Sequence, residues 1–211
     1  MVEAIIFDWH GVLDKRTFNG FLCSLAKQWY DKHQVQLNEF CTPSVSLEAY
    51  RSDVVSDIGR LAGPYALSQN PEREFWDWLG AKWHAVPDEA KQSMLSVEQD
   101  EGVWRLLAGL KLSYKLAILS DCPKDKGELI RKTQDLNLFD VVCFSYETCL
   151  LKDERGAYDV VSRKLQLPPT HCVLVDDSIK NTVYASNLGF QAAHFRNSSD
   201  LEKQLSTFRK A

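Results

Sequence analysis

The sequence predicts an α/β protein whose core is a doubly wound, mostly parallel, Rossmann-like sheet with an inserted helical domain. Two observations support this prediction. Short apolar runs alternate with segments of helical periodicity, a pattern typical of a parallel sheet that helices cover on both faces. Between the first apolar run and the second lies a long stretch that has helical patterns and little that resembles a strand.

Five apolar runs are expected to be strands. They are Ala4–Phe7, Lys115–Leu119, Val141–Phe144, Cys172–Val175 and Gln191–Phe195. Residues 126–137, 158–165 and 180–188 have helical periodicity, so right-handed crossovers should connect parallel strands. Gly189 follows the last of these segments, where the end of a helix favours a left-handed residue.

The predicted insertion covers residues 15–97, so the α/β core should consist of residues 1–14 and 98–211. Helical patterns within the insertion cover 17–36, 45–61, 72–83 and 88–95, and prolines punctuate them. Aromatic side chains recur at helical spacing in the third of these patterns. The sequence leaves the oligomeric state open.

Composition argues against several classes of protein. The chain has 211 residues, a net charge of −4 and 45% hydrophobic residues, which is ordinary for a globular protein and gives no basic face for nucleic acid or a membrane. No apolar stretch approaches the roughly 20 residues that span a bilayer, and the N-terminus lacks a signal-peptide pattern. Six cysteines without paired spacing favour reduced thiols in a cytoplasmic protein.

Polar side chains stand where three of the predicted strands end. They are Asp8, then Ser120 and Asp121, then Asp176 and Asp177. Ligands of open parallel sheets bind at the carboxyl ends of the strands, so we expect these groups to converge there. Carboxylates suit Mg²⁺, while a hydroxyl and a lysine such as Lys152 suit phosphoryl oxygens. An Asp that faces both a metal and phosphorus can attack phosphorus and become an aspartyl phosphate.

Four segments resemble, in order, the motifs of the haloacid dehalogenase-like (HAD) hydrolase superfamily. They read FDWHGVL, LAILSD, LLKDERGAYDVV and VLVDDS. The resemblance implies that Asp8 is the nucleophile, that Ser120 and Lys152 hold the phosphoryl group, and that the insertion is a small α-helical cap. It also implies that Asp176 and Asp177 bind Mg²⁺.

Further residues complete the predicted site. Asp8 and the backbone carbonyl of His10 are expected to join the metal ligands. Gly11 should let the backbone turn close beneath the phosphate, and Asp121 is a candidate to line the phosphate site.

One position departs from the family pattern. Phosphatases of the superfamily usually carry a second Asp two residues after the nucleophile, where this sequence has His10. We expect His10 to be the general acid/base, because imidazole exchanges protons near neutral pH. Two alternatives stay open: a catalytically impaired protein that binds phosphate or a partner, and a member with other chemistry, since DWxG resembles phosphonatases. Halide displacement does not need Mg²⁺, so the pair Asp176–Asp177 argues against it.

The sequence therefore predicts a Mg²⁺-dependent hydrolase, a phosphatase of phosphoric monoesters. Its substrate is expected to be a small phosphorylated metabolite, and no nucleic-acid or membrane partner is expected.

Overall fold

The computed structural model describes residues 1–17, 64–67, 75–77, 91–92 and 94–208. Five strands form one sheet in these residues: β1 (Ala4–Phe7), β2 (Lys115–Ser120), β3 (Val141–Phe144), β4 (Cys172–Asp176) and β5 (Gln191–His194). All neighbouring strands are parallel, in the order β3-β2-β1-β4-β5. The predicted α/β fold is confirmed, and each predicted strand ends within one residue of the observed end.

The strand order places β1 at the centre of the sheet. Its last residue, Phe7, lies between Ile118 of β2 and Val175 of β4. The chain runs outward from β1 to β2 and β3, and then crosses to β4 and β5 on the other side. A reversal of strand order of this kind opens a crevice at the carboxyl ends of the central strands.

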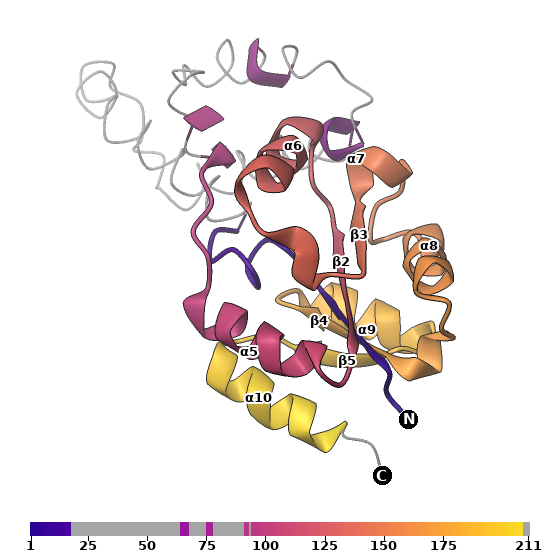
Figure 1. Ribbon diagram of the computed structural model, residues 1–211. Helices are drawn as coiled ribbons and strands as arrows, with labels where there is room; N and C mark the ends of the chain where they lie inside the picture. The colour runs from indigo at the N-terminus through magenta and orange to yellow at the C-terminus, as the bar shows by residue number, and fades with distance from the viewer. Residues whose placement is uncertain (18–63, 68–74, 78–90, 93, 209–211) are drawn as a thin grey trace, which may run out of the picture.

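Helices cover both faces of the sheet (Figure 1). They are α5 (Glu101–Lys111), α6 (Lys124–Thr133), α7 (Ser145–Thr148), α8 (Arg155–Leu165), α9 (Ile179–Asn187) and α10 (Ser198–Thr207). Ile5 and Phe7 of β1 belong to a core cluster with α5 and α10, whereas Ala4 and Ile6 belong to a cluster with α8 and α9. Successive side chains of a strand point to opposite faces, so every residue of β1 is buried.

Helix bounds were predicted less well than strand bounds. Helix α6 was expected over 126–137, but it ends at Thr133, and a separate 3-10 turn covers Leu136–Leu138. Asp135 caps that turn by accepting a hydrogen bond from the backbone of Asn137. Helices α5 and α10 were not predicted, although Asp100 and Asn197 cap them with side-chain oxygens.

Most of the predicted insertion lies outside the described residues. The predicted helices 17–36 and 45–61 lie outside the described residues, except for Thr17, which is not helical. Of the predicted helices 72–83 and 88–95, the structure describes residues 75–77, 91–92 and 94–95, and all of these are helical. The division into a core and a helical domain therefore stays a prediction. Within the described residues no helix has the length and hydropathy to cross a membrane, and none of the four cysteines forms a disulfide.

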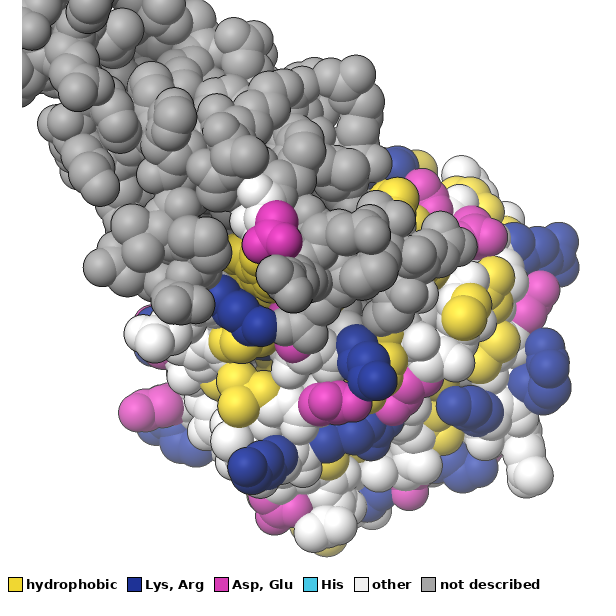
Figure 2. Space-filling view, turned by 90° about the horizontal axis from the view of Figure 1, so that it is seen from above, with side chains coloured by type: hydrophobic (Ala, Val, Ile, Leu, Met, Phe, Trp, Pro, Cys, Tyr) yellow, Lys and Arg dark blue, Asp and Glu magenta, His cyan; other side chains and the backbone are white. Residues whose placement is uncertain are grey.

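Charged side chains of both signs are scattered over the described residues on one face of the molecule. Figure 2 shows Lys and Arg interspersed with Asp and Glu over this part of the upper face. On that face the described residues form no continuous basic region of the kind that binds nucleic acid.

Candidate active site

Three buried polar residues stand at the carboxyl ends of neighbouring strands. The backbone N–H of Asp8 donates to the carbonyl of Val175 at 2.9 Å, which extends the ladder between β1 and β4 by one residue. Ser120 is the last residue of β2 and Asp176 the last of β4. Asp8, Ser120 and Asp176 are each at most 5% exposed as whole residues, so this edge of the sheet is a buried polar centre.

Lys152 joins two of these strand ends. Its Nζ lies 2.7 Å from Oδ2 of Asp8 and 2.7 Å from Oδ2 of Asp176, and its side chain is 4% exposed. Burial disfavours the charged amine, but the carboxylates of Asp8 and Asp176 outweigh burial and raise the pKa of Lys152 above its ordinary value. The lysine is therefore a permanent cation of the site.

Asp8, Asp176 and Asp177 form a cluster of carboxylates. One oxygen from each lies within 4.8 Å of the others. Burial and the charge of Asp8 raise the pKa of Asp176, and the same two causes raise the pKa of Asp177 to about 6. The single ammonium of Lys152 leaves negative charge uncompensated, and hard oxygen ligands at this spacing fit Mg²⁺.

Neighbouring groups fix the orientation of the acidic pair. The amide Nδ2 of Asn181 donates to both oxygens of Asp176 at 3.1 Å, and the backbone N–H of Ser178 donates to Oδ1 of Asp176 at 2.8 Å. Nε2 of His194, at the end of β5, donates to the carbonyl of Asp177 at 3.0 Å. Such outer contacts hold metal ligands in place. Sequence reasoning missed His194, whose position at a strand end beside β4 was the available signal.

Gly11 occupies a position that strongly favours glycine. Its φ is +78°, a left-handed conformation, and a Cβ atom there would overlap the carboxylate of Asp177. Its N–H donates to the carbonyls of Asp14 at 2.7 Å and Arg16 at 3.2 Å. The glycine therefore lets the loop after β1 pass directly beside the acidic pair.

His10 lies beside Ser120, with 3.5 Å between its Nδ1 and the hydroxyl oxygen. His10 is half-buried as a whole residue. Burial and the nearby charge of Lys126 lower the pKa of His10 to about 3, against an opposing effect of Asp14. This shift favours the neutral ring, so the ordinary imidazole pKa on which the acid/base expectation for His10 rested does not apply in this arrangement.

Asp121 holds the loop that carries Lys152. Its Oδ1 accepts a hydrogen bond from the backbone N–H of Lys152 at 2.9 Å. Burial raises the pKa of Asp121 to about 6, with Lys152 opposing the shift. The described contact gives Asp121 a supporting role, and its predicted contact with phosphate stays a prediction.

No family model and no curated protein sequence matches the chain. Solved structures do match it over nearly its whole length. An HAD-family enzyme of Bacteroides thetaiotaomicron has a TM-score of 0.72 at 17% identity, covering 99% of each chain. A protein of Porphyromonas gingivalis described as a predicted HAD-like family hydrolase has a TM-score of 0.69 at 17% identity, covering 100% of each chain. The chain has the HAD fold.

Proteins that share this fold are described in different terms. The Bacteroides enzyme was also solved in complex with magnesium and inorganic phosphate, and this form has a TM-score of 0.67 at 15% identity over 93% of this chain and 96% of that one. An L-2-haloacid dehalogenase has a TM-score of 0.64 at 18% identity over 98% of this chain and 100% of that one. The HAD fold alone therefore does not choose between phosphoryl transfer and dehalogenation.

Proposed function

We propose that the chain is a Mg²⁺-dependent phosphatase that acts on a small phosphorylated metabolite through an aspartyl phosphate on Asp8. The observation that carries this proposal is the arrangement of Lys152 between Asp8 and Asp176, in a cluster of three carboxylates. A carboxylate nucleophile, a buried ammonium and a set of hard oxygen ligands together suit phosphoryl transfer.

The ligands proposed for Mg²⁺ are the carboxylates of Asp8, Asp176 and Asp177 with the backbone carbonyl of His10. The ion would neutralise charge on the phosphoryl oxygens and on the carboxylates that surround them. Displacement of halide has no need of such a cation, so the acidic pair favours the phosphatase over the dehalogenases of the same fold.

The chain's own groups supply the remaining chemistry. Oδ1 of Asp8 accepts a hydrogen bond from the backbone N–H of Trp9 at 2.7 Å, which fixes the carboxylate. Asp8 attacks phosphorus as the bond to the leaving oxygen breaks, and Lys152 and Ser120 donate hydrogen bonds to the phosphoryl oxygens. Water then attacks phosphorus as the bond between phosphorus and the Asp8 oxygen breaks, which releases phosphate and regenerates the carboxylate of Asp8. His10, next to Ser120, has a lowered pKa and a neutral ring, so its role in these steps is to accept the proton of the attacking water, while the leaving oxygen takes a proton from solvent.

The experiment is a phosphate-release assay on a broad panel of phosphate esters, with and without Mg²⁺. Asp8→Asn removes the nucleophile with little change of shape, and we expect it to lower turnover by about a thousandfold or more. Asp159→Asn is the matched control, because Asp159 is half exposed on α8 and pairs only with Arg155 among the described contacts. Turnover that survives in Asp8→Asn would contradict the mechanism.

A second outcome would favour the alternative of an impaired, binding-only protein. Beryllofluoride mimics a phosphoryl group on a carboxylate, and its binding can be followed by ¹⁹F NMR. Beryllofluoride bound through Asp8, with no phosphate released from any ester, would indicate a phosphate-binding domain without turnover.

We expect the enzyme in the cytoplasm, consistent with the unpaired cysteines of the described residues.

A further inference from the structure

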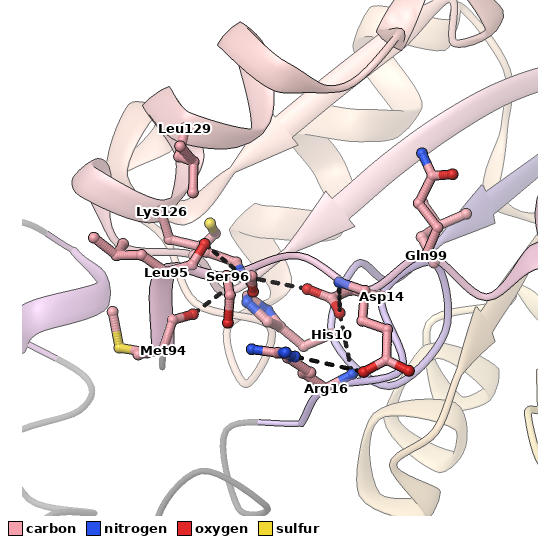
Figure 3. A network of polar contacts seen from close by, with 12 residues as sticks. His10, Asp14, Arg16, Met94, Leu95, Ser96, Gln99, Lys126 and Leu129 are labelled. Atoms are coloured by element: carbon pink, nitrogen blue, oxygen red, sulfur yellow. Dashed lines mark hydrogen bonds and ion pairs between the residues drawn. The ribbon is translucent and has the colours of Figure 1, made fainter. Parts of the chain in front are cut away.

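A buried lysine on α6 lies outside the catalytic machinery described above. The side chain of Lys126 is 1% exposed. Its Nζ donates to Oδ2 of Asp14 at 3.2 Å, to the carbonyl of Met94 at 3.1 Å and to that of Ser96 at 2.7 Å, with the carbonyl of Leu95 at 3.5 Å (Figure 3). Burial lowers the pKa of Lys126, and Asp14 opposes this shift. The ammonium thus fills a cage of oxygen atoms.

Asp14 uses its second oxygen to hold two distant chain segments together. Its Oδ1 accepts hydrogen bonds from the backbone N–H groups of Arg16 at 3.1 Å and Glu98 at 3.0 Å, and the residue is fully buried. The backbone N–H of Lys15 donates to the carbonyl of Glu98 at 2.8 Å, and Asp14 and Gln99 form an antiparallel bridge. Residues 13–16 and 96–100, here called the flanking ribbon, therefore run side by side at the two ends of the predicted insertion.

The flanking ribbon continues directly into the loop that follows β1. The carbonyl of Trp9 accepts hydrogen bonds from the N–H groups of Leu13 and Asp14, at 3.0 and 2.9 Å. The N–H of Gly11 donates back to the carbonyl of Asp14 at 2.7 Å. His10 lies within this closed loop, so movement of Asp14 would be transmitted to it.

We propose that Asp14 and Lys126 form an internal clasp that fastens the flanking ribbon to α6 and thereby positions the loop carrying His10. The ammonium takes the place that a bound monovalent cation would take among backbone carbonyls and a carboxylate. Both residues are positioning residues, because in the described contacts they touch neither Lys152 nor the carboxylates of Asp8, Asp176 and Asp177, and Asp14 meets His10 only through the backbone bridge. The effect on turnover rests on the proposed phosphatase activity, whereas the clasp itself does not.

The clasp is tested by hydrogen exchange of the full chain, read by mass spectrometry on peptides that cover the flanking ribbon. Lys126→Met leaves the carboxylate of Asp14 buried without its cation, so exchange in both halves of the ribbon should rise by about tenfold or more while β2 and β4 stay protected. Lys124→Met is the matched control, since Lys124 lies on the same helix with a side chain that is 62% exposed. Unchanged exchange in the ribbon would overturn the clasp.

A second pair of measurements separates the clasp from a general loss of folding. Lys126→Ala removes three carbons and the ammonium group of the side chain, which together correspond to propylammonium. Added propylammonium should therefore restore protection of the flanking ribbon from exchange, and neutral 1-propanol should not. Asp14→Asn keeps the shape of the side chain and should loosen the same two segments even if Lys126→Met fails to fold. Failure of propylammonium to restore protection, together with no loosening in Asp14→Asn, would overturn the proposal.

Steady-state kinetics test the positioning role. With an ester that the enzyme hydrolyses, Lys126→Met should lower kcat several-fold at nearly unchanged KM, because the phosphoryl ligands are intact while the loop is not. An unchanged kcat in a variant whose ribbon exchanges faster would overturn the positioning role and leave the clasp standing. If the wild-type protein hydrolyses no ester, the proposed function fails, and hydrogen exchange still decides on the clasp.

Discussion

Removal of the ammonium of Lys152 from among the carboxylates should lower the free energy of unfolding of the metal-free protein more than almost any other single substitution at this site. Lys152→Met keeps the length of the side chain but leaves Asp8, Asp176 and Asp177 without their ammonium. The carboxylates would then face one another in a buried place with no opposite charge. We therefore expect a large loss in the free energy of unfolding, provided that Mg²⁺ is absent.

The distances set the size of this loss. At 2.7 Å and an effective dielectric constant of about 20, each of the two ion pairs of Lys152 has a gross Coulomb energy of about 6 kcal/mol. The cost of burying the charges offsets much of this energy, and removal of one partner from a buried pair costs about 3–5 kcal/mol. For a chain of this size, that loss lowers Tm by about 6–20 °C.

The assay is thermal and urea unfolding in EDTA and in excess Mg²⁺. Mg²⁺ should raise Tm more in Lys152→Met than in the wild-type protein, because the cation then replaces the missing ammonium. Lys124→Met, with its exposed side chain, is the control and should change the free energy of unfolding by less than about 1 kcal/mol. Asp8→Asn combined with Lys152→Met should recover part of the loss, since one of the repelling carboxylates is gone.

Two results would refute this reasoning. The first is a Lys152→Met variant as stable as the wild-type protein in EDTA, which would mean that the carboxylates are neutralised in another way. The second is a Tm that responds to Mg²⁺ equally in both proteins, which would mean that lysine and metal do not share the same negative charge.

Three further substitutions test other parts of the site. Gly11→Ala should lower the free energy of unfolding by about 1–3 kcal/mol and weaken Mg²⁺ binding, because of its positive φ and the overlap with Asp177; urea unfolding and calorimetry measure the two effects. Since the pKa of Asp121 is raised from 3.8 to about 6, the native state binds more protons in that range and stability falls as pH rises from about 4 to about 6. In Asp121→Asn, the fall in unfolding free energy between about pH 4 and about pH 6 should be smaller by up to about 3 kcal/mol. If the fall is unchanged, groups other than Asp121 cause it. Asn181→Ala should weaken Mg²⁺ affinity by about tenfold or more in calorimetry, because Asp176 loses its amide donor; unchanged affinity would exclude that support.

The strand ends of the site could be predicted because their signal is local. An apolar run that stops on a polar residue identifies both the strand and the side chain at its carboxyl end, as for Asp8, Ser120 and Asp176. The parallel arrangement then brings these ends together without any knowledge of the packing. Lys152 could be assigned to the site only from the order of the motifs, because a lysine in a loop resembles a solvated surface residue when only the sequence is known.

The clasp could not be predicted for the opposite reason. Asp14 and Lys126 are far apart in the chain, and the only apolar residues beside Asp14 are Val12 and Leu13, a pair too short to predict a strand. Lys126 reads as one of the polar residues of an amphipathic helix, yet its side chain is 1% exposed. The direction of the pKa shift of His10 also depends on burial and on Lys126, and the sequence gives no information on either.

The central position of β1 has a consequence for the order in which this protein can fold. β1 leaves the ribosome first, but its two neighbours, β2 and β4, begin only at Lys115 and Cys172. Until Asp176 has been synthesised, the central strand lacks one of its partners and Asp8 lacks its neighbour. Contacts between segments so distant in the chain form slowly, and the nascent chain meanwhile presents an apolar strand with unsatisfied edges. The candidate active site is therefore assembled late, only after β4 has joined β1.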